Sequence, residues 1–275
     1  IGQNGAGKTT MMKLMTGLLM PTAGQIRVLC HDPFKKERTY KRKITLLLGQ
    51  KQQLWWDVSA KDNYRLLKDI YELSNQKYEQ NLKELVEMLG AEDILDSPVR
   101  TLSLGERMKC ELIGSLIYKP EILFLDEPTI GMDLIAQKDV REFIRNYSLK
   151  NNATVILTSH NMGDIEAVCD RTIFLDEGKV YYDGKLSHFV KEHGKDVLIF
   201  IDSMDQSDGS SWEELGSVIE RNDSQIKLRV KKDNISLVKH RLADDKYVTN
   251  YMIREMDAED IVRDFYEMEK KYEGA

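Results

Sequence analysis

The clearest chemical pattern in this sequence lies within its first ten residues. Residues 2–9 fit the pattern G-x-x-x-x-G-K-[ST] without a mismatch. This pattern is typical of a phosphate-binding loop, in which glycines let successive backbone N–H groups converge on nucleotide phosphates. In such a loop Lys8 would reach the β- and γ-phosphates, and the Thr9 hydroxyl would bind Mg²⁺. The plainer alternative is a glycine-rich turn that only caps a helix. The predicted loop residues are Gly2, Gln3, Asn4, Gly5, Ala6, Gly7, Lys8, Thr9 and Thr10.

A second group of polar residues follows short apolar segments of the kind that form buried strands. Asp126 and Glu127 come directly after one such run, at the point where a phosphate-loop protein needs a ligand near Mg²⁺. Gln50 and His160 also stand just past apolar runs, where polar residues often belong to a site. Each has a plainer alternative when it is taken singly. Glu127 could be a salt-bridge partner, His160 a satisfied loop histidine and Gln50 a solvated loop residue.

The spacing of the apolar residues predicts the elements that position these groups. Apolar residues at helical spacing over 8–19 predict a helix that starts at the phosphate loop and points its N-terminus at the phosphates. The runs at 44–48, 122–125 and 155–157 predict buried strands, and residues 25–29 also read as a strand. Strand, polar tip and helix recur in this order, which predicts a parallel α/β sheet.

A stretch of helical periodicity interrupts this α/β pattern. It covers about 60–118 and predicts a small inserted helical subdomain. Within it, Ser103 and Glu106 have the spacing of a capping box at the start of a helix. A well-capped helix start can also receive a phosphate, so the structural and the functional interpretation of Ser103 coincide.

Composition limits the classes of protein to which the chain can belong. Its 275 residues are 41% hydrophobic, which is enough for the core of one large domain or two ordinary ones. The formal charge of −6 argues against a nucleic-acid surface spread over the whole protein. No apolar run approaches the roughly 18 residues that cross a bilayer. Three scattered cysteines fit neither a metal site nor a disulfide framework, as expected in a reducing cytosolic compartment.

The phosphate loop also bears on how the chain is divided. It normally follows a buried strand, yet here it begins almost at Ile1, so we expect the sequence to lack the amino-terminal portion of its domain. We place the α/β domain at 1–194 and a second domain at 195–275. Strand and helix patterns predict that the second is a small α+β domain, with a ferredoxin-like arrangement as one option.

The order and spacing of the motifs resemble the nucleotide-binding domain of ABC transporters. The resemblance covers residues 1 to about 190. Within that family, the segment Leu54-Trp55-Trp56-Asp57 after Gly49-Gln50, together with the sequence at 102–107, looks like the ATPase subunits of bacterial ABC-2 type exporters. The matching segments are the phosphate loop at 2–9, the Q-loop at Gln50, the signature at 102–106, Walker B at 122–127, the D-loop at Asp133 and the switch histidine at His160.

The resemblance implies that the protein binds ATP together with Mg²⁺ and hydrolyses it. Thr9, Gln50 and Asp126 would then hold the metal. Glu127 would act as the general base on the attacking water, which Gln50 would also reach. His160 would contact the γ-phosphate and sense its loss.

In this family the signature of one subunit contacts the nucleotide bound by the other. The resemblance therefore implies that ATP joins two copies into a head-to-tail homodimer and that hydrolysis releases them, because only the closed state contacts ATP from both sides. Ser103, Gly105, Glu106 and Asp133 would serve this contact. Leu104 and Glu106 depart from the usual LSGGQ, whereas Ser103 and Gly105 are retained, so we expect the signature to work. The aromatic A-loop residue that stacks on adenine falls outside the sequence.

The function implied by the resemblance is that of an ATPase subunit that drives a separate ABC-2 type membrane permease from the cytoplasmic face, with export as the expected direction. Trp55 and Trp56 would either pack against the helical subdomain or contact the permease. The alternative is a soluble ABC ATPase in translation or DNA repair, but the second cassette, long coiled coils or zinc sites of such proteins are not seen here. A GTPase switch is a further alternative, but the sequence lacks the N-K-x-D motif that recognises guanine. The second domain would stabilise the dimer. A more specific alternative is that it regulates the dimer.

Overall fold

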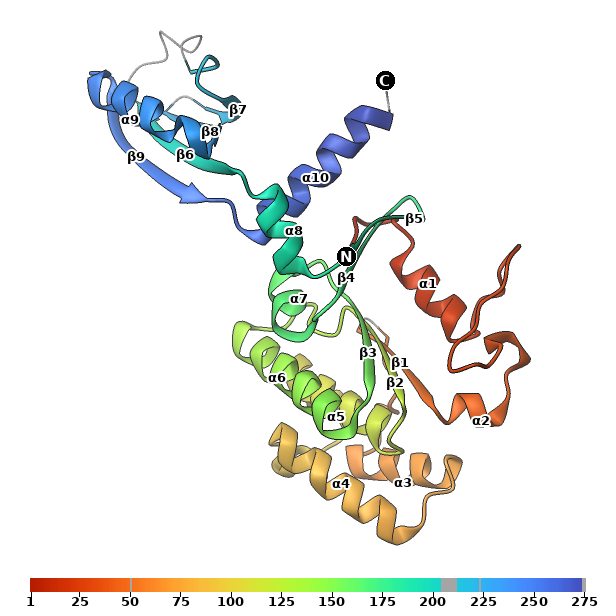
Figure 1. Cartoon of the computed structure of the whole chain (residues 1–275). Helices are drawn as coiled ribbons and strands as arrows, with labels where there is room; N and C mark the ends of the chain where they lie inside the picture. The colour runs from red at the N-terminus through yellow and green to blue at the C-terminus, as the bar shows by residue number, and fades with distance from the viewer. Residues whose placement is uncertain (50, 204–211, 223, 274–275) are drawn as a thin grey trace. The chain divides into compact units, whose positions relative to one another are not determined.

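The chain divides into two compact units, Ile1–Asp183 and Gly184–Ala275 (Figure 1). The computed structural model describes residues 1–49, 51–203, 212–222 and 224–273. Among these described residues, no helix is both long enough and apolar enough to cross a lipid bilayer.

A parallel sheet forms the centre of the first unit. Its strands are β1 (Ile44–Leu48), β2 (Ile122–Asp126) and β3 (Thr154–Thr158), in the order β1-β2-β3. This confirms the parallel sheet that the sequence predicts. In register, Leu48 pairs with Asp126 and Asp126 pairs with Thr158, so the carboxyl ends of all three strands meet at one edge.

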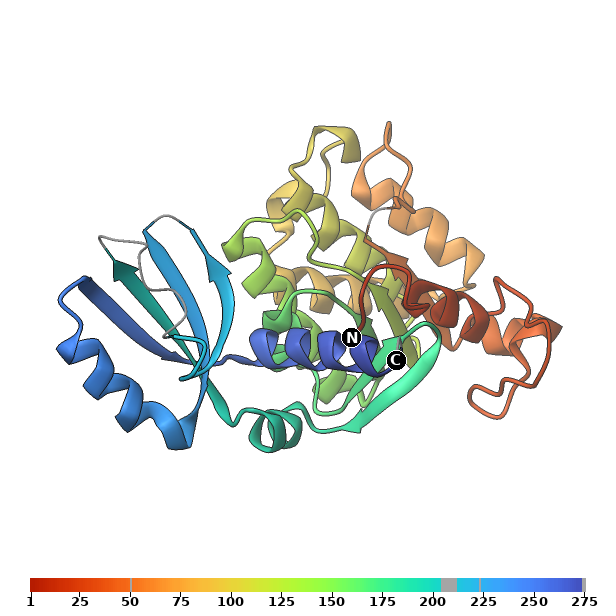
Figure 2. The ribbon, with the colours of Figure 1, turned by 90° about the horizontal axis from the view of Figure 1, so that it is seen from above.

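Helices cover both faces of this sheet because the strand side chains alternate between the faces. Met12 of α1 (Lys8–Met15) packs with Phe124 on one face. Leu123 packs on the opposite face, in the cluster formed by α5 (Leu104–Leu116) and α6 (Leu134–Asn151). Viewed from above, α1 in dark red and the yellow-green helices lie on opposite sides of the green strands (Figure 2). The strands whose carboxyl ends meet are therefore supported by packed side chains on both faces of the sheet.

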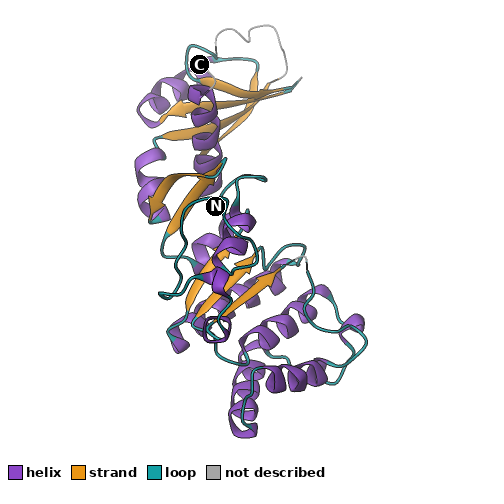
Figure 3. Cartoon of the chain, turned by 90° about the vertical axis from the view of Figure 1, so that its right-hand side faces the viewer, coloured by secondary structure: helices purple, strands orange, loops and turns teal. Residues whose placement is uncertain are grey.

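A group of helices, α3 (Ala60–Ile70), α4 (Asn75–Leu89) and α5, occupies the stretch for which helical periodicity is predicted. Helices α3 and α4 lie at one end of the first unit, beyond its strands, whereas α5 also packs on a face of the sheet (Figure 1 and Figure 3). Short 3₁₀ turns at Glu92–Ile94 and Val99–Thr101 return the chain from α4 to α5. The hydroxyl of Ser74 caps α4 by accepting a hydrogen bond from the backbone N–H of Lys77, and Gly90 ends the helix in the left-handed conformation.

Two sequence predictions near the start of the chain are wrong. The first helix ends at Met15 rather than at residue 19, because Thr16 and then Gly17, with φ of +75°, turn the chain away. Residues 25–29 form no strand, since Val28 pairs only with His31 across a tight turn. The chain then forms a 3₁₀ turn at Pro33–Lys35 and the short helix α2 (Arg38–Lys41).

A two-stranded sheet of β4 (Thr172–Asp176) and β5 (Lys179–Gly184) closes the first unit, after helix α7 (Met162–Val168). The first residue of the chain lies beside β4. Its amino group donates to the carbonyl of Ile173, 2.8 Å away, and its carbonyl accepts from the N–H of Leu175, 2.9 Å away. The phosphate loop thus starts from the edge of this small sheet.

The second unit starts earlier than the expected boundary at residue 194. Helix α8 (Leu186–His193) belongs to it. The physical reason is an aromatic contact, because Phe189 of α8 meets Phe265 of α10 (Ala258–Glu273) edge to face with 5.2 Å between ring centroids.

An antiparallel sheet in the order β7-β8-β6-β9 forms the body of the second unit. Its strands are β6 (Asp196–Ser203), β7 (Ser217–Arg221), β8 (Gln225–Lys231) and β9 (Val248–Glu255). Strand β8 lies between β6 and β7, and β6 lies between β8 and β9, as in the split arrangement of ferredoxin-like sheets. A 3₁₀ turn at Lys232–Asn234 leads into α9 (Ile235–Asp244), whose Val238 joins the apolar core on one face of the sheet. Strand β7 was not predicted from the sequence.

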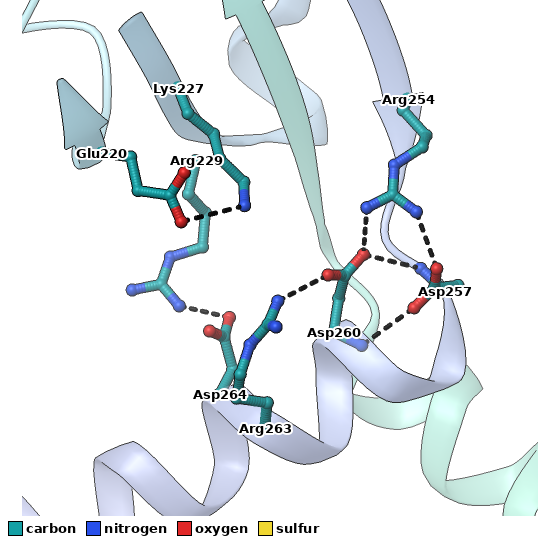
Figure 4. Close-up of polar contacts among 8 residues, drawn as sticks. All are labelled: Glu220, Lys227, Arg229, Arg254, Asp257, Asp260, Arg263 and Asp264. Carbon is teal, nitrogen blue, oxygen red and sulfur yellow. Dashed lines mark hydrogen bonds and ion pairs between the residues drawn. The ribbon is translucent and has the colours of Figure 1, made fainter. Parts of the chain in front are cut away.

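Ion pairs attach α10 to this sheet (Figure 4). Arg254 of β9 lies 2.6 Å from Asp257 and 2.6 Å from Asp260, and Arg229 of β8 pairs with Asp264. Asp260 also accepts a hydrogen bond of 2.7 Å from Arg263 (Figure 4). The start of α10 is therefore fixed by charge as well as by packing.

Candidate functional site

The predicted phosphate loop folds around its own lysine. Gly5 and Gly7 have φ of +88° and +99°, a region that glycine enters without strain, and Gly7 is the N-cap of α1. The buried Lys8 Nζ donates to the backbone carbonyls of Gly2, at 2.6 Å, and Gln3, at 3.0 Å. An ammonium group and the first N–H groups of a helix are thereby joined in one short loop, which suits phosphate.

Asp126 connects the phosphate loop to the sheet. Its Oδ2 accepts a hydrogen bond of 2.8 Å from the Thr9 hydroxyl, and its Oδ1 accepts one of 2.5 Å from the Thr158 hydroxyl. Thr9 and Asp126, two of the predicted metal ligands, are thus brought together. A hydroxyl and a carboxylate are oxygen donors of the kind that Mg²⁺ prefers, so the donor set fits that ion. Thr158 was not predicted as a site residue. It follows the apolar run at 155–157, but its partner Asp126 is set by the strand register.

Glu127, the predicted base, and His160, the predicted switch residue, lie next to each other. His160 Nδ1 is 3.3 Å from Glu127 Oε1. The Glu127 backbone has a φ of +52°, and its N–H donates to the carbonyl of Thr158 at 2.9 Å. A non-glycine residue costs roughly 1–3 kcal/mol in this conformation, so the surrounding contacts must hold it there. The pair forms where β2 and β3 end.

The chain that leads into the predicted Q-loop passes directly over the end of β2. The Gly49 N–H donates to the carbonyl of Asp126 at 2.8 Å. A Cβ atom on Gly49 would lie 2.1 Å from the backbone oxygen of Glu127, so this close approach requires glycine. Gln50 itself lies outside the described residues, and its predicted roles remain predictions.

The segment that follows Gln50 is bound to the helical part of the unit by side chains that the sequence analysis did not single out. The buried Glu111 of α5 accepts hydrogen bonds from the backbone N–H groups of Gln53, at 3.0 Å, and Leu54, at 3.2 Å. Asn63 of α3 accepts from the N–H of Trp55 at 2.7 Å and donates to its carbonyl at 3.0 Å. Burial raises the pKa of the Glu111 carboxyl. These contacts have no sequence motif that could have revealed them.

The two tryptophans of this segment have different surroundings. The Arg107 guanidinium of α5 lies over the ring of Trp56, 4.9 Å from its centroid, whereas Trp55 is 65% exposed. Trp56 thus contacts the helical part, which is one of the two predicted options, although 41% of its surface remains exposed. Trp55 leaves a large apolar side chain on the surface.

The predicted signature begins α5 with the expected capping box. Glu106 Oε2 accepts hydrogen bonds from the Ser103 hydroxyl at 2.7 Å and from the Ser103 N–H at 2.9 Å. The hydroxyl bond from Ser103 helps to lower the pKa of Glu106. Ser103 remains exposed, and a Cβ on Gly105 would lie 3.0 Å from Ala136 Cβ of α6. Asp133, the predicted D-loop residue, caps α6 by accepting from the N–H of Ala136 at 2.9 Å. Signature and D-loop therefore pack together.

Comparisons with known proteins agree on the character of this site. The sequence profile of the ABC transporter family matches residues 1–130. The ABC transporter ATP-binding protein NatA of Bacillus subtilis is 32% identical over 201 residues, which are 73% of this chain and 81% of NatA. The daunorubicin resistance ATP-binding protein DrrA3 of Streptomyces coeruleorubidus is 33% identical over 72% of this chain and 62% of its own length. A solved ATP-binding subunit of an ABC transporter aligns with a TM-score of 0.62 and 28% identity, over 70% of this chain and 80% of that one.

Proposed function

The chain belongs to the family of ABC transporter ATP-binding proteins, and from that premise we propose that it binds and hydrolyses ATP to drive a separate membrane permease, with export as the direction. One observation carries the enzymatic part of this proposal. Asp126 joins the phosphate-loop residue Thr9 to the strand edge, directly beside the pair of Glu127 and His160. Phosphate binding, metal ligation and base chemistry are thus available at one edge of one sheet.

Different residues have different roles in the transfer of the phosphoryl group to water. The backbone N–H groups of the phosphate loop and Lys8 bind the phosphates. Thr9 and Asp126 would hold Mg²⁺, which supplies charge neutralisation on the phosphate oxygens when it is bound. Glu127 accepts a proton from the attacking water as general base. His160, beside Glu127, contacts the γ-phosphate.

A second copy of the chain would complete the nucleotide site. Ser103 lies exposed at the capped N-terminus of α5, where a phosphate is favoured by the N–H groups and the helix dipole. Because the signature serves the opposite subunit in this family, ATP would join two copies head to tail. Hydrolysis would remove the ligand that holds the closed state and shift the population towards the open one.

The permease would be reached through the helical part of the first unit. A cavity of about 310 Å³ opens there between β1, α3 and α5, and Glu111 and Leu54 are among its lining residues. The exposed Trp55 belongs to the same loop. Trp56 of this loop is also 41% exposed, and neighbouring exposed aromatic side chains suit contact with another protein. This contact would place the protein at the cytoplasmic face of the membrane, and the resistance function named for DrrA3 supports export.

Co-purification tests the transport part of the proposal. The full-length protein is tagged and extracted from membranes in mild detergent, with and without ATP, and its companions are identified. A multi-helix membrane protein that co-purifies would support the transporter function. A protein found wholly in the soluble fraction without such a companion would favour the alternative of a soluble ABC ATPase.

A further inference from the structure

A buried polar network lies beside the pair of Glu127 and His160 and has no role in the mechanism described above. Its centre is Asp164 of α7, whose side chain is only 1% exposed. None of the sequence motifs contains this residue. A carboxylate buried to this degree is retained in a protein only where its partners satisfy it.

Three side chains from three separate segments donate to this carboxylate. Asp164 Oδ2 accepts from the hydroxyls of Thr129, at 2.6 Å, and Ser159, at 2.5 Å. Asp164 Oδ1 accepts from Nε of Arg141 at 2.6 Å. Thr129 follows β2, Ser159 follows β3, and Arg141 belongs to α6. Removing the carboxylate would therefore release three segments at once and leave the Arg141 charge without its partner.

Two of these donors are close neighbours of the reacting groups. Thr129 lies two residues after Glu127, and Ser159 directly precedes His160. Glu127 has a φ of +52°, and a strained backbone of this kind persists only where the surroundings hold it. Asp164 thus ties together the two loops that carry the 3.3 Å contact between Glu127 and His160.

The network continues to the start of α6. Arg141 Nη2 donates to the side-chain oxygen of Gln137 at 3.0 Å, and Asn161 Nδ2 donates to the same oxygen at 3.3 Å. Gln137 Nε2 in turn donates to the carbonyl of Met132 at 3.0 Å. Met132 directly precedes Asp133, the D-loop residue. A continuous chain of hydrogen bonds therefore joins Asp164 to the segment expected to face the second copy.

We propose that Asp164 is a positioning residue for ATP hydrolysis, whose carboxylate holds Glu127 and His160 in reacting geometry and links them to the D-loop segment. Because its side chain is only 1% exposed, Asp164 would act through Thr129, Ser159 and Arg141 and not by direct contact with the substrate. The inference rests on the proposed ATPase function, because it assigns Asp164 to the same catalytic pair.

Steady-state ATPase kinetics of the full chain test the proposal with the variants Asp164→Asn and Thr129→Val. The second variant removes one donor and keeps a β-branched side chain, so it decides the matter if Asp164→Asn does not fold. We expect kcat to fall about tenfold or more in each, because small misplacements of reacting groups are costly. KM and the Kd for ATP should stay within about twofold of wild type, since the phosphate loop is untouched.

A matched control separates positioning from general stability. Arg145→Met removes another contact between α6 and α7, the 2.9 Å hydrogen bond from Arg145 to the carbonyl of Ala167, which does not involve Asp164. Its kcat should equal that of wild type. The proposal is overturned if Asp164→Asn and Thr129→Val keep wild-type kcat, or if Arg145→Met lowers kcat equally at the same Tm. A wild-type protein without ATPase activity would overturn the proposed function instead, and Glu127→Gln shows whether the measured activity belongs to this site.

Discussion

The hydroxyl of Thr9 donates to the carboxylate of Asp126 across 2.8 Å, although 117 residues separate the two in the sequence. The contact exists because α1 packs on the face of β2 that carries Phe124, which aligns the start of the helix with the end of the strand. The fold thus assembles the metal side of the site from two distant segments. Both side chains offer oxygen atoms to Mg²⁺.

Removal of the Thr9 hydroxyl should weaken the binding of Mg²⁺. For Thr9→Ala we expect the Mg²⁺ concentration for half-maximal ATPase activity to rise at least about tenfold, a typical loss when a metal site is impaired. A Mg²⁺ titration at saturating ATP measures this. Thr9→Ser keeps a hydroxyl at the same place and serves as the control. Equal Mg²⁺ dependence in the alanine and wild-type proteins would show that Thr9 does not bind the metal.

Neutralising Glu127 should separate binding from turnover. In Glu127→Gln the side chain keeps its shape but cannot accept a proton from water, so we expect kcat to fall about 10²–10⁴-fold, the usual contribution of a positioned base. ATP binding should persist, and the head-to-tail dimer should accumulate because it is no longer released. Phosphate release and size-exclusion chromatography with ATP measure the two effects. A variant that hydrolyses ATP at the normal rate would show that Glu127 is not the base.

The sequence predicts those features of the site that depend on local pattern. Strand ends indicate Asp126, Glu127 and His160, because a polar residue after an apolar run is visible without the fold. Thr158 also follows an apolar run, but only the strand register places its hydroxyl on Asp126, and Asp164 belongs to no sequence pattern at all. Their roles arise from strand register and from the packing of α7 against α6, which are tertiary features. Residues 25–29 show the opposite case, since an apolar segment that looks like a strand turns back on itself instead.

Ser103 should act twice, as a helix cap and as a contact for ATP on the second copy. Ser103→Ala should cost about 1 kcal/mol of folding free energy, as the loss of an N-cap usually does. It should also weaken the ATP-dependent dimer in the Glu127→Gln background. Ser74 caps α4 in the same manner, so Ser74→Ala should cost a similar free energy without affecting the dimer. Urea unfolding and sedimentation velocity with ATP measure the two effects. Equal dimerisation in both alanine variants would leave Ser103 with the capping role alone.

Glu84 and the buried Glu111 should make the free energy of unfolding depend on pH in opposite directions. Burial raises the pKa of Glu111, so its contribution is present below the unfolded pKa and is lost as pH rises through the folded value. Hydrogen bonds from Lys119 and Lys150 lower the pKa of Glu84, whose contribution is lost as pH falls. From pH 4 to 8, measured by urea unfolding, Glu111→Gln should therefore gain stability relative to wild type, whereas Glu84→Gln should lose it. Parallel pH profiles for the two variants would contradict the burial of a carboxyl at position 111.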